Sequence, residues 1–361
     1  MAGWTLPRSS DEPLTGVRIA VDVMGGDHGP REVVPGALDH AVRHPEDTIL
    51  LVGRDDAIRT VAPTLPTNVL VRPASQVIEM EEHPALALRE KRDASITVAC
   101  DLVHRGEADA VVTAGHTGAG MAAAVLRIGR LPRVDRPALA VQMVRRGSPF
   151  VLLDIGANPD STAENLAQYA RMGAIFAERV LGIASPRIAL LSIGEEKGKG
   201  DLRIQRATEL IDASGLRFVG NVEGKDLVAD MADVIVTDAV VGNVVIKFFE
   251  GLSTFIFDLF REQFETGVRG RLAYLLLRPG IRRIRDVFDY ERAGGSPLLG
   301  VRGGVIITHG RARRRMIAFA VEVAARMARE RVPQRIAEAL RDDEGTGAAA
   351  EADATTEEAT A

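Results

Sequence analysis

The sequence predicts an α/β protein with a three-layer αβα, Rossmann-like fold, in which a largely parallel sheet lies between two layers of helices and an amphipathic helical hairpin protrudes. Three observations support this prediction. Short apolar runs that fit buried strands alternate with segments of helical periodicity. Loops rich in glycine and polar residues follow several of these runs. Six of the eleven phenylalanines lie between residues 248 and 264, on one wide face of a helix.

Composition is that of a globular protein in a reducing compartment. The 361 residues are 46% hydrophobic and 4% aromatic, enough for one large or two modest domains. The single cysteine, Cys100, allows no disulfide framework, which favours the cytoplasm. The first 15 residues lack a signal-peptide pattern, and no run of about 18 apolar residues is uninterrupted, so we expect neither export nor a membrane-spanning segment.

Charge and composition also indicate the domain limits. We expect the domain at residues 17–341, with disordered segments at 1–16 and 342–361. The net charge is −5, but the last segment carries seven acidic residues and no basic one. The rest of the chain has 45 basic and 43 acidic residues, so nothing indicates nucleic-acid binding.

Eight strands and several helices are expected in sequence order. The strands span residues 17–23, 48–52, 110–113, 150–153, 187–192, 218–222, 234–237 and 305–308. Helices are expected at 95–104, 121–128, 162–181 and 202–213. Strands that alternate with helices favour a largely parallel sheet, which binds ligands at the carboxyl ends of its strands.

The loop after the first strand is the most informative stretch. Its candidate binding residues are Asp22, Gly25, Gly26, Asp27 and His28. The glycines allow backbone angles closed to other residues, and Pro30 suits the first position of a helix. Free amides at a helix N-terminus can bind an anion, and the carboxylates and imidazole can orient polar groups around it.

Similar loops follow five later strands. Their candidate residues are Gly115, His116, Thr117 and Gly118, then Asp154 and Asn158, then Glu196 and Lys199, then Asn221 and Glu223, and finally Asp238 and Asn243. We expect these loops to lie on one edge of the sheet and to form one polar cleft.

Familiar nucleotide and metal motifs are missing. Residues 194–199 fall one residue short of the phosphate loop GxxxxGK[ST], and no GxGxxG follows the first strand. His28, His116 and His309 lack partners at metal-ligand spacing. We therefore expect no cofactor and no metal.

The lysines have an unusual distribution. Arginine outnumbers lysine 40 to 5, yet Lys197 and Lys199 share one loop. Because lysine offers a compact point charge where arginine offers a planar fork, we expect Lys199, between two glycines, to contact phosphate or an oxyanion. Chance clustering of so few lysines is the alternative.

The hairpin is expected at about residues 243–288. Its phenylalanine face must be buried, either on the core or on a second subunit. A second interpretation adds that a leucine-rich tip, edged with arginine, contacts an anionic membrane surface. The residues expected at this contact are Leu275, Leu276, Leu277 and Arg278.

Taken together, these motifs resemble the bacterial phosphate acyltransferase family, over about residues 17–340. The matching segments are 22–30, 114–119, 154–158, 194–196 with 199–200, 220–223, Asp238 with 242–243, 294–295 and 309–310. The sequence departs from the family at three places. His116 and Asp201 stand where asparagine is usual, and residues 239–241 (Ala-Val-Val) replace a Gly-Phe-Thr type sequence.

The resemblance implies an enzyme that makes acyl phosphate from long-chain fatty acyl-[acyl carrier protein] and inorganic phosphate at the start of phospholipid biosynthesis. It also implies a homodimer whose hairpins pack together at the inner face of the cell membrane, making a cytoplasmic, peripherally associated protein. A membrane glycerol-3-phosphate acyltransferase would then take up the product.

Chemistry suggests roles for the loop residues. Loops 115–118 and 194–200 are assigned to phosphate together with Lys199, and His116 and Asn243 are candidate donors to carbonyl or phosphate oxygens. The carboxylates are expected to orient loops, because bare carboxylates repel phosphate.

Two alternatives remain. One is a short-chain phosphate acetyl- or butyryltransferase that uses coenzyme A, and the other is a non-catalytic scaffold at the membrane surface. The arginine-edged apolar hairpin favours a long-chain lipid substrate over the first, and the several polar loops favour catalysis over the second.

Overall fold

The computed structural model describes residues 16–79, 81–145, 148–265, 267–287, 291 and 294–341. The two expected terminal segments therefore lie outside the described residues, apart from Gly16.

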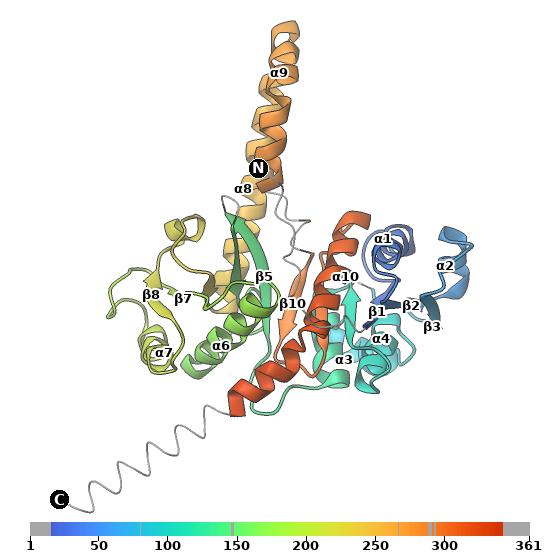
Figure 1. The fold of residues 1–361 in the computed structure, drawn as a ribbon, viewed down its shortest axis with the longest axis horizontal. Coiled ribbons are helices and arrows are strands. Elements are labelled where there is room, and N and C mark those ends of the chain that lie inside the picture. Colours follow the sequence, from blue (N-terminus) through green and yellow to red (C-terminus); the bar gives the residue numbers. More distant parts are fainter. Residues whose placement is uncertain are drawn as a thin grey trace, which may run out of the picture.

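In the described part of the chain, one sheet of eleven strands runs through the middle of the molecule, in the order β3-β2-β1-β4-β11-β10-β5-β6-β9-β7-β8 (Figure 1). The strands are β1 (Arg18–Asp22), β2 (Thr48–Gly53), β3 (Val69–Pro73), β4 (Ala110–Thr113), β5 (Ala138–Arg145), β6 (Ser148–Leu153), β7 (Ile188–Leu191), β8 (Phe218–Val222), β9 (Val234–Val236), β10 (Ser296–Leu299) and β11 (Gly304–Ile307). All eight expected strands are present, and β3, β5 and β10 are additional.

The sheet consists of two parallel groups that run in opposite directions. Strands β3, β2, β1, β4 and β11 are parallel to one another, and so are β6, β9, β7 and β8. Between the groups, β10 is antiparallel to both β11 and β5, and β5 is antiparallel to β6. The expectation that all the polar loops share one sheet edge is therefore wrong, because β5 and β10 reverse the direction of the sheet.

Helices cover both faces of the sheet. They are α1 (Pro30–Arg43), α2 (Asp55–Val61), α3 (Pro84–Glu90), α4 (Ser95–His104), α5 (Thr117–Ala123), α6 (Ala163–Arg179), α7 (Leu202–Asp212), α8 (Ala239–Glu265), α9 (Gly267–Val287) and α10 (Arg314–Arg329), with a π-helical turn η1 (Ala124–Ile128) and a 3-10 turn η2 (Gly224–Val228). One hydrophobic core packs α1, α6, α7 and α10 on one face, and the other packs α4, α5 and η1 on the opposite face.

Successive side chains of a strand point alternately into the two hydrophobic cores. On β1, Ile19 and Val21 belong to the first core and Ala20 to the second, as the two-residue period of a strand requires. The three-layer αβα fold expected from the sequence is thus confirmed.

Several helix boundaries follow local rules visible in the sequence. Pro30 stands in the first turn of α1, after Gly29 with a φ of 48°. Thr162 caps α6 in a reciprocal capping box with Asn165. The helix expected at 121–128 begins earlier, at Thr117, and continues as η1.

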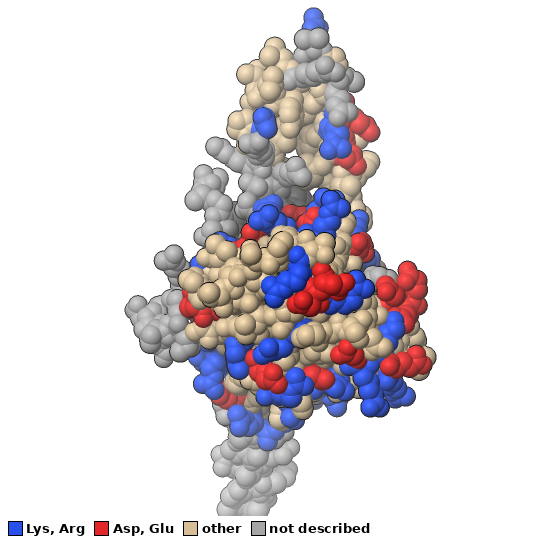
Figure 2. Space-filling model, turned by 90° about the vertical axis from the view of Figure 1, so that its right-hand side faces the viewer, with Lys and Arg blue, Asp and Glu red and all other residues tan. Residues whose placement is uncertain are grey.

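The hairpin of α8 and α9 projects from the body as a long stalk (Figure 1). The two helices pack against each other, with the Phe264 and Tyr274 rings 5.8 Å apart. Many apolar side chains remain exposed, including Phe248 at 68% and Leu276 at 75%. On the face shown in Figure 2, the described atoms of the hairpin are mostly uncharged, whereas the body carries mixed charges. Such a surface indicates contact with another molecule.

Candidate functional site

The loops after β1 and β4 pack backbone against backbone. A Cβ atom on Gly25 would lie 2.7 Å from the amide nitrogen of Gly115 and 2.9 Å from the carboxylate of Asp22. No side chain fits there, so this contact requires glycine at position 25. Gly26 has a φ of +85°, and a Cβ atom on it would lie 2.9 Å from the carbonyl oxygen of Gly310. The loop after β11 therefore joins the same cluster.

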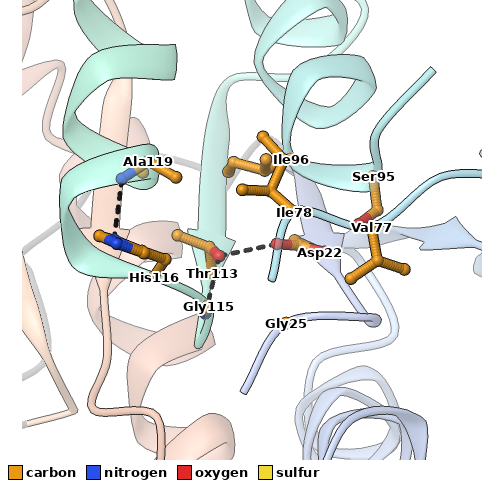
Figure 3. Close-up of a pocket in the computed structure, with 11 residues that line it drawn as sticks. Asp22, Gly25, Val77, Ile78, Ser95, Ile96, Thr113, Gly115, His116 and Ala119 are labelled. Carbon is orange, nitrogen blue, oxygen red and sulfur yellow. Dashed lines mark hydrogen bonds between the residues drawn. The ribbon is translucent and has the colours of Figure 1, made fainter. Parts of the chain in front are cut away.

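Asp22 lies buried at the base of this cluster (Figure 3). Its carboxylate accepts a hydrogen bond of 2.7 Å from the Thr113 hydroxyl, which in turn accepts one of 3.1 Å from the Gly115 amide. Burial raises the pKa of Asp22. A cavity of about 10 Å³ beside these residues is close to the space that one water molecule needs. Asp22 thus links the two glycine loops.

His116 forms the N-cap of α5. Its Nδ1 accepts a hydrogen bond of 3.3 Å from the amide of Ala119 (Figure 3). In the neutral ring the proton then lies on Nε2, which makes His116 a hydrogen-bond donor. Gly118 lies directly against the His116 ring, where a Cβ would be 3.0 Å from Cε1. Asp27 and His28, in the loop after β1, are exposed.

Asp154 organises the loop after β6. Its fully buried carboxylate accepts hydrogen bonds of 2.8 to 3.1 Å from four backbone amides, those of Leu139, Gly156, Ala157 and Asn158. Burial raises its pKa, although these amides favour the ionised form. The Asn158 side chain donates to Asp154, to the Pro137 carbonyl and to the Tyr169 hydroxyl. Asp154 and Asn158 therefore use their polar atoms within the loop.

The first turn of α8 packs directly on this loop. Asp238 caps the helix by accepting hydrogen bonds from the amides of Val240 and Val241, at 2.9 and 3.0 Å. Its second oxygen accepts one of 2.9 Å from Arg203. A Cβ on Gly242 would lie only 2.0 Å from the carbonyl oxygen of Asp154. Glycine at 242 is thus what lets α8 start beside the β6 loop.

The loops after β7 and β8 form a separate group. Asn221 is buried, and its side chain donates to the Glu196 carbonyl at 3.4 Å. Glu223 and Glu195 both pair with Lys225. Lys197 pairs with Asp212 at 3.1 Å. Lys199 is exposed, and its ammonium group has no hydrogen bond or ion pair with any described residue.

A cavity of about 450 Å³ lies between the two halves of the sheet. Residues from β5, β11, α8 and the loop after β6 make its apolar wall, among them Leu139, Val141, Met143, Ile155, Phe249 and Ile307. Its polar lining includes Thr117, Gln142, Asn243, Lys247, Glu250 and His309. Ile155 and Gly156, which follow β6, and Thr308, His309 and Gly310, which follow β11, all line it, so loops of the two oppositely directed groups meet at this cavity.

This cavity brings together only part of the set expected from the sequence. Thr117 and Asn243 line it. The loop cluster described above reaches it through Thr117 and Gly310, and it contains Asp22, Gly25, Gly26, Gly115, His116 and Gly118. Asp154 lies behind the wall that Ile155 and Gly156 form. Glu196, Lys199, Asn221 and Glu223 are not among the lining residues.

Sequence reasoning missed several lining residues. Lys247 is exposed and has no hydrogen bond or ion pair with any described residue. His309 accepts a hydrogen bond of 3.3 Å from the Arg311 amide at Nδ1, which leaves Nε2 as the donor in the neutral ring. The rarity of lysine in this chain was a usable signal for Lys247. Gln142 lies on β5, a strand that was not predicted.

The expected membrane-contact residues lie away from the cavity, on α9. Leu275, Leu276, Leu277 and Arg278 are all exposed. They are on the middle of α9 and not at the hairpin turn, so the expectation of a leucine-rich tip is wrong in detail. Among the described helices, α8 alone is long and apolar enough to cross a membrane, and almost none of its apolar stretch is buried.

Comparison with known proteins confirms the resemblance seen in the motifs. The sequence pattern of a family described as "Fatty acid synthesis protein" matches residues 17–335. The phosphate acyltransferase of Desulfitobacterium hafniense (strain Y51) is 45% identical over 311 residues, which cover 85% of this chain and 92% of that protein. That of Heliobacterium modesticaldum is 44% identical over 330 residues, which cover 90% of this chain and 97% of that protein.

Solved structures share the fold at low sequence identity. The EutD phosphotransacetylase from Staphylococcus aureus has a TM-score of 0.58 and 16% identity, and covers 87% of this chain and 94% of its own. A phosphotransacetylase from Streptococcus pyogenes has a TM-score of 0.59 and 19% identity, with the same coverage of 87% and 94%. On the strength of the family match and of relatives 44 to 45% identical over most of its length, this chain belongs to the phosphate acyltransferase family of enzymes.

Proposed function

We propose that this enzyme transfers a long-chain acyl group from acyl carrier protein to inorganic phosphate, forming acyl phosphate. The cavity between the two halves of the sheet carries the proposal. Its volume of about 450 Å³ falls within the range of about 300–1,000 Å³ found for small-molecule sites. An apolar wall suits a hydrocarbon chain, and the polar residues beside it suit phosphate.

The reaction needs no nucleophile from the protein. A phosphate oxygen attacks the thioester carbonyl carbon, the new C–O bond replaces the C–S bond, and the phosphate proton goes to the departing thiolate. Phosphate is partly dianionic near pH 7, and a thiol with a pKa near 8.5 is a fair leaving group. The site must therefore position both reactants and stabilise the oxyanion, where one donor typically contributes about 10² to 10³ in rate.

Several side chains can supply these donors and charges. Asn243 and His309 line the cavity and can donate to the carbonyl or phosphate oxygens. Lys247 and Lys199 offer ammonium groups that have no hydrogen-bond or ion-pair partner in the described part of the chain. Asp22 and Asp154 are occupied with loop amides and hydroxyls, which fits a positioning role.

The exposed hairpin supports a proposal on partners and location. In a homodimer the phenylalanine face would be covered by a second subunit. The α9 leucines with Arg278 would contact an anionic membrane surface, at the cytoplasmic side of the cell membrane. We further propose, as the family resemblance implies, that the acyl phosphate is delivered to a membrane glycerol-3-phosphate acyltransferase for phospholipid synthesis.

A donor comparison tests the proposed activity. Purified enzyme with phosphate is given palmitoyl carrier protein, palmitoyl coenzyme A or acetyl coenzyme A, and thiol release and acyl phosphate are measured. We expect both products from the palmitoyl donors, with carrier protein preferred. Fast turnover of acetyl coenzyme A alone would support the short-chain alternative, and no turnover with any donor would support the scaffold.

The hairpin proposal predicts a separable defect in membrane binding. The double substitution Leu275→Glu with Leu276→Glu places charges on exposed apolar positions, so we expect loss of sedimentation with anionic vesicles but near-normal catalysis on the carrier-protein substrate. High salt should weaken wild-type binding. The screening length is about 8 Å near physiological ionic strength, and it shortens as the salt concentration rises. Leu86→Glu with Leu126→Glu, exposed on the body, is the matched control and should bind vesicles normally. A double mutant that becomes monomeric yet still binds vesicles would contradict the proposal.

Activity is expected to persist in EDTA without added magnesium. Phosphate can attack a thioester without metal activation. Among the described residues that line the cavity, His309 and Glu250 are present but no further histidine, cysteine or carboxylate. The measurement is the initial rate before and after chelation. Loss of activity that one specific metal restores would contradict this expectation.

A further inference from the structure

A second cluster of reactive side chains lies where α1 packs against α10. It contains His40 in the last turn of α1, His44 at the C-cap of that helix, and Glu322 on α10. The two imidazole rings stack with centroids 4.5 Å apart. The two histidines are four residues apart in the sequence, a spacing that places them on the same side of a helix.

Three atoms of this cluster converge on one point. One ligand atom from each of His40, His44 and Glu322 lies within 4.8 Å of the other two. Oε2 of Glu322 is 3.2 Å from the His40 nitrogen and 3.0 Å from the His44 nitrogen. Two ligands bonded at about 2.0–2.1 Å to a tetrahedral zinc ion lie about 3.3 Å apart, so these separations match a shared ion.

Two of these atoms are orphaned. His40 is fully buried, and neither its Nδ1 nor Oε2 of Glu322 has a hydrogen-bond partner in the described part of the chain. They are close to each other but misaligned for a hydrogen bond. Buried polar atoms of this kind cost free energy unless something satisfies them.

The opposite nitrogens of both rings face carboxylates. His40 Nε2 is 2.9 Å from Asp47, and His44 Nδ1 is 3.2 Å from Glu46. Arg329 in turn contacts both Asp47 and Glu46. Histidine ligands of metals are typically held by such a carboxylate on the second nitrogen, which fixes the tautomer and raises the basicity of the ligating nitrogen.

The geometry points to a zinc site formed by His40, His44 and Glu322, with solvent as the fourth ligand. Zinc fits a set of two imidazoles and one carboxylate. His44 and Glu322 are 28% and 22% exposed at their side chains, so an ion can enter and a water molecule can complete the tetrahedron. Bound zinc would fasten α1 to α10. It is separate from the proposed reaction, since none of the three residues lines the cavity.

Zinc binding and thermal unfolding of the full-length chain test the site. Protein stripped with a chelator is titrated with zinc, passed over a gel-filtration column and analysed for metal. We expect about one tightly held zinc ion per chain. The melting temperature should rise by about 4 °C once free zinc exceeds the Kd about 100-fold. Absence of zinc after gel filtration, with an unchanged melting temperature, would overturn the proposal and leave the cluster as a proton-binding ion-pair network.

The zinc affinity of single-residue variants tests which side chains bind the ion. His44→Gln and Glu322→Gln replace partly exposed residues, so folding should persist, and each should weaken zinc binding by at least about 100-fold, because even outer-shell partners cost about 10- to 100-fold. Glu46→Gln should weaken it by only about 10-fold. His104→Gln, an exposed histidine on α4, is the control and should bind zinc like the wild type. Equal zinc affinity in His44→Gln, Glu322→Gln and His104→Gln would exclude the assigned ligands.

Discussion

Gly242→Ala is expected to destabilise the protein by about 3 kcal/mol or more and to abolish measurable turnover. The added Cβ would lie 2.0 Å from the Asp154 carbonyl oxygen and 3.0 Å from the Ile155 Cα, both backbone atoms. Since neither can rotate away, α8 must shift off the β6 loop. That shift would displace Asn243 and Lys247 from the cavity, and misplacement by about 1 Å can cost about 100-fold in rate.

The same helix provides the control. Gly251 lies later in α8, exposed, and a Cβ there would meet no atom within 4 Å. Gly251→Ala should therefore stabilise α8 by up to about 1 kcal/mol and leave activity intact. Urea unfolding and steady-state kinetics measure both variants. If Gly242→Ala unfolds at the same urea concentration as Gly251→Ala, the close contact between α8 and Asp154 does not exist in solution.

Local chemistry explains why much of the fold was predictable. The run Ile19-Ala20-Val21 is buried on both sides, and Ser95–His104 forms α4 with the expected limits. The prediction failed at β3, β5 and β10. The edge strand β3 has a partly exposed pattern, and β10 is short and contains Pro297. Strand direction also escaped prediction, because β5 and β10 are placed by pairing partners distant in sequence.

The same distinction between local and long-range features applies to the candidate site. The loop glycines were expected for their backbone freedom, whereas the structure requires glycine at 25 and 242 because another backbone segment lies too close for a side chain. The cavity itself depends on α8 crossing near β5 and β6, which no local pattern encodes. The unusual residues His116 and Asp201 both cap helices by accepting a backbone amide hydrogen bond. Asparagine can also make that bond, so the departure from the family preserves the local structure.

Lys199→Ala is expected to lower turnover by about 100-fold or more and to weaken the dependence on phosphate, with the fold intact. Lys199 follows the glycine-rich turn after β7, is exposed, and has no partner among the described residues, so its charge is available to an anion. Lys197 in the same loop is the matched control, because its ammonium already pairs with Asp212. Lys197→Ala should leave the kinetics nearly unchanged.

Comparing Lys247→Ala with Lys199→Ala tests which of the two lysines without a partner among the described residues binds the phosphate. Lys247 lines the cavity and Lys199 does not, so a phosphate held inside the cavity must respond to Lys247. We expect Lys247→Ala to raise the KM for phosphate and to lower kcat/KM by about 10² to 10³. Initial rates over a range of phosphate concentrations, at fixed palmitoyl carrier protein, measure both variants. If Lys199→Ala retains wild-type kinetics and melting temperature while Lys247→Ala loses phosphate dependence, the β7 loop is not part of the phosphate site. If only Lys199→Ala is impaired, phosphate binds at the β7 loop, and α8 must move toward that loop for acyl transfer to occur.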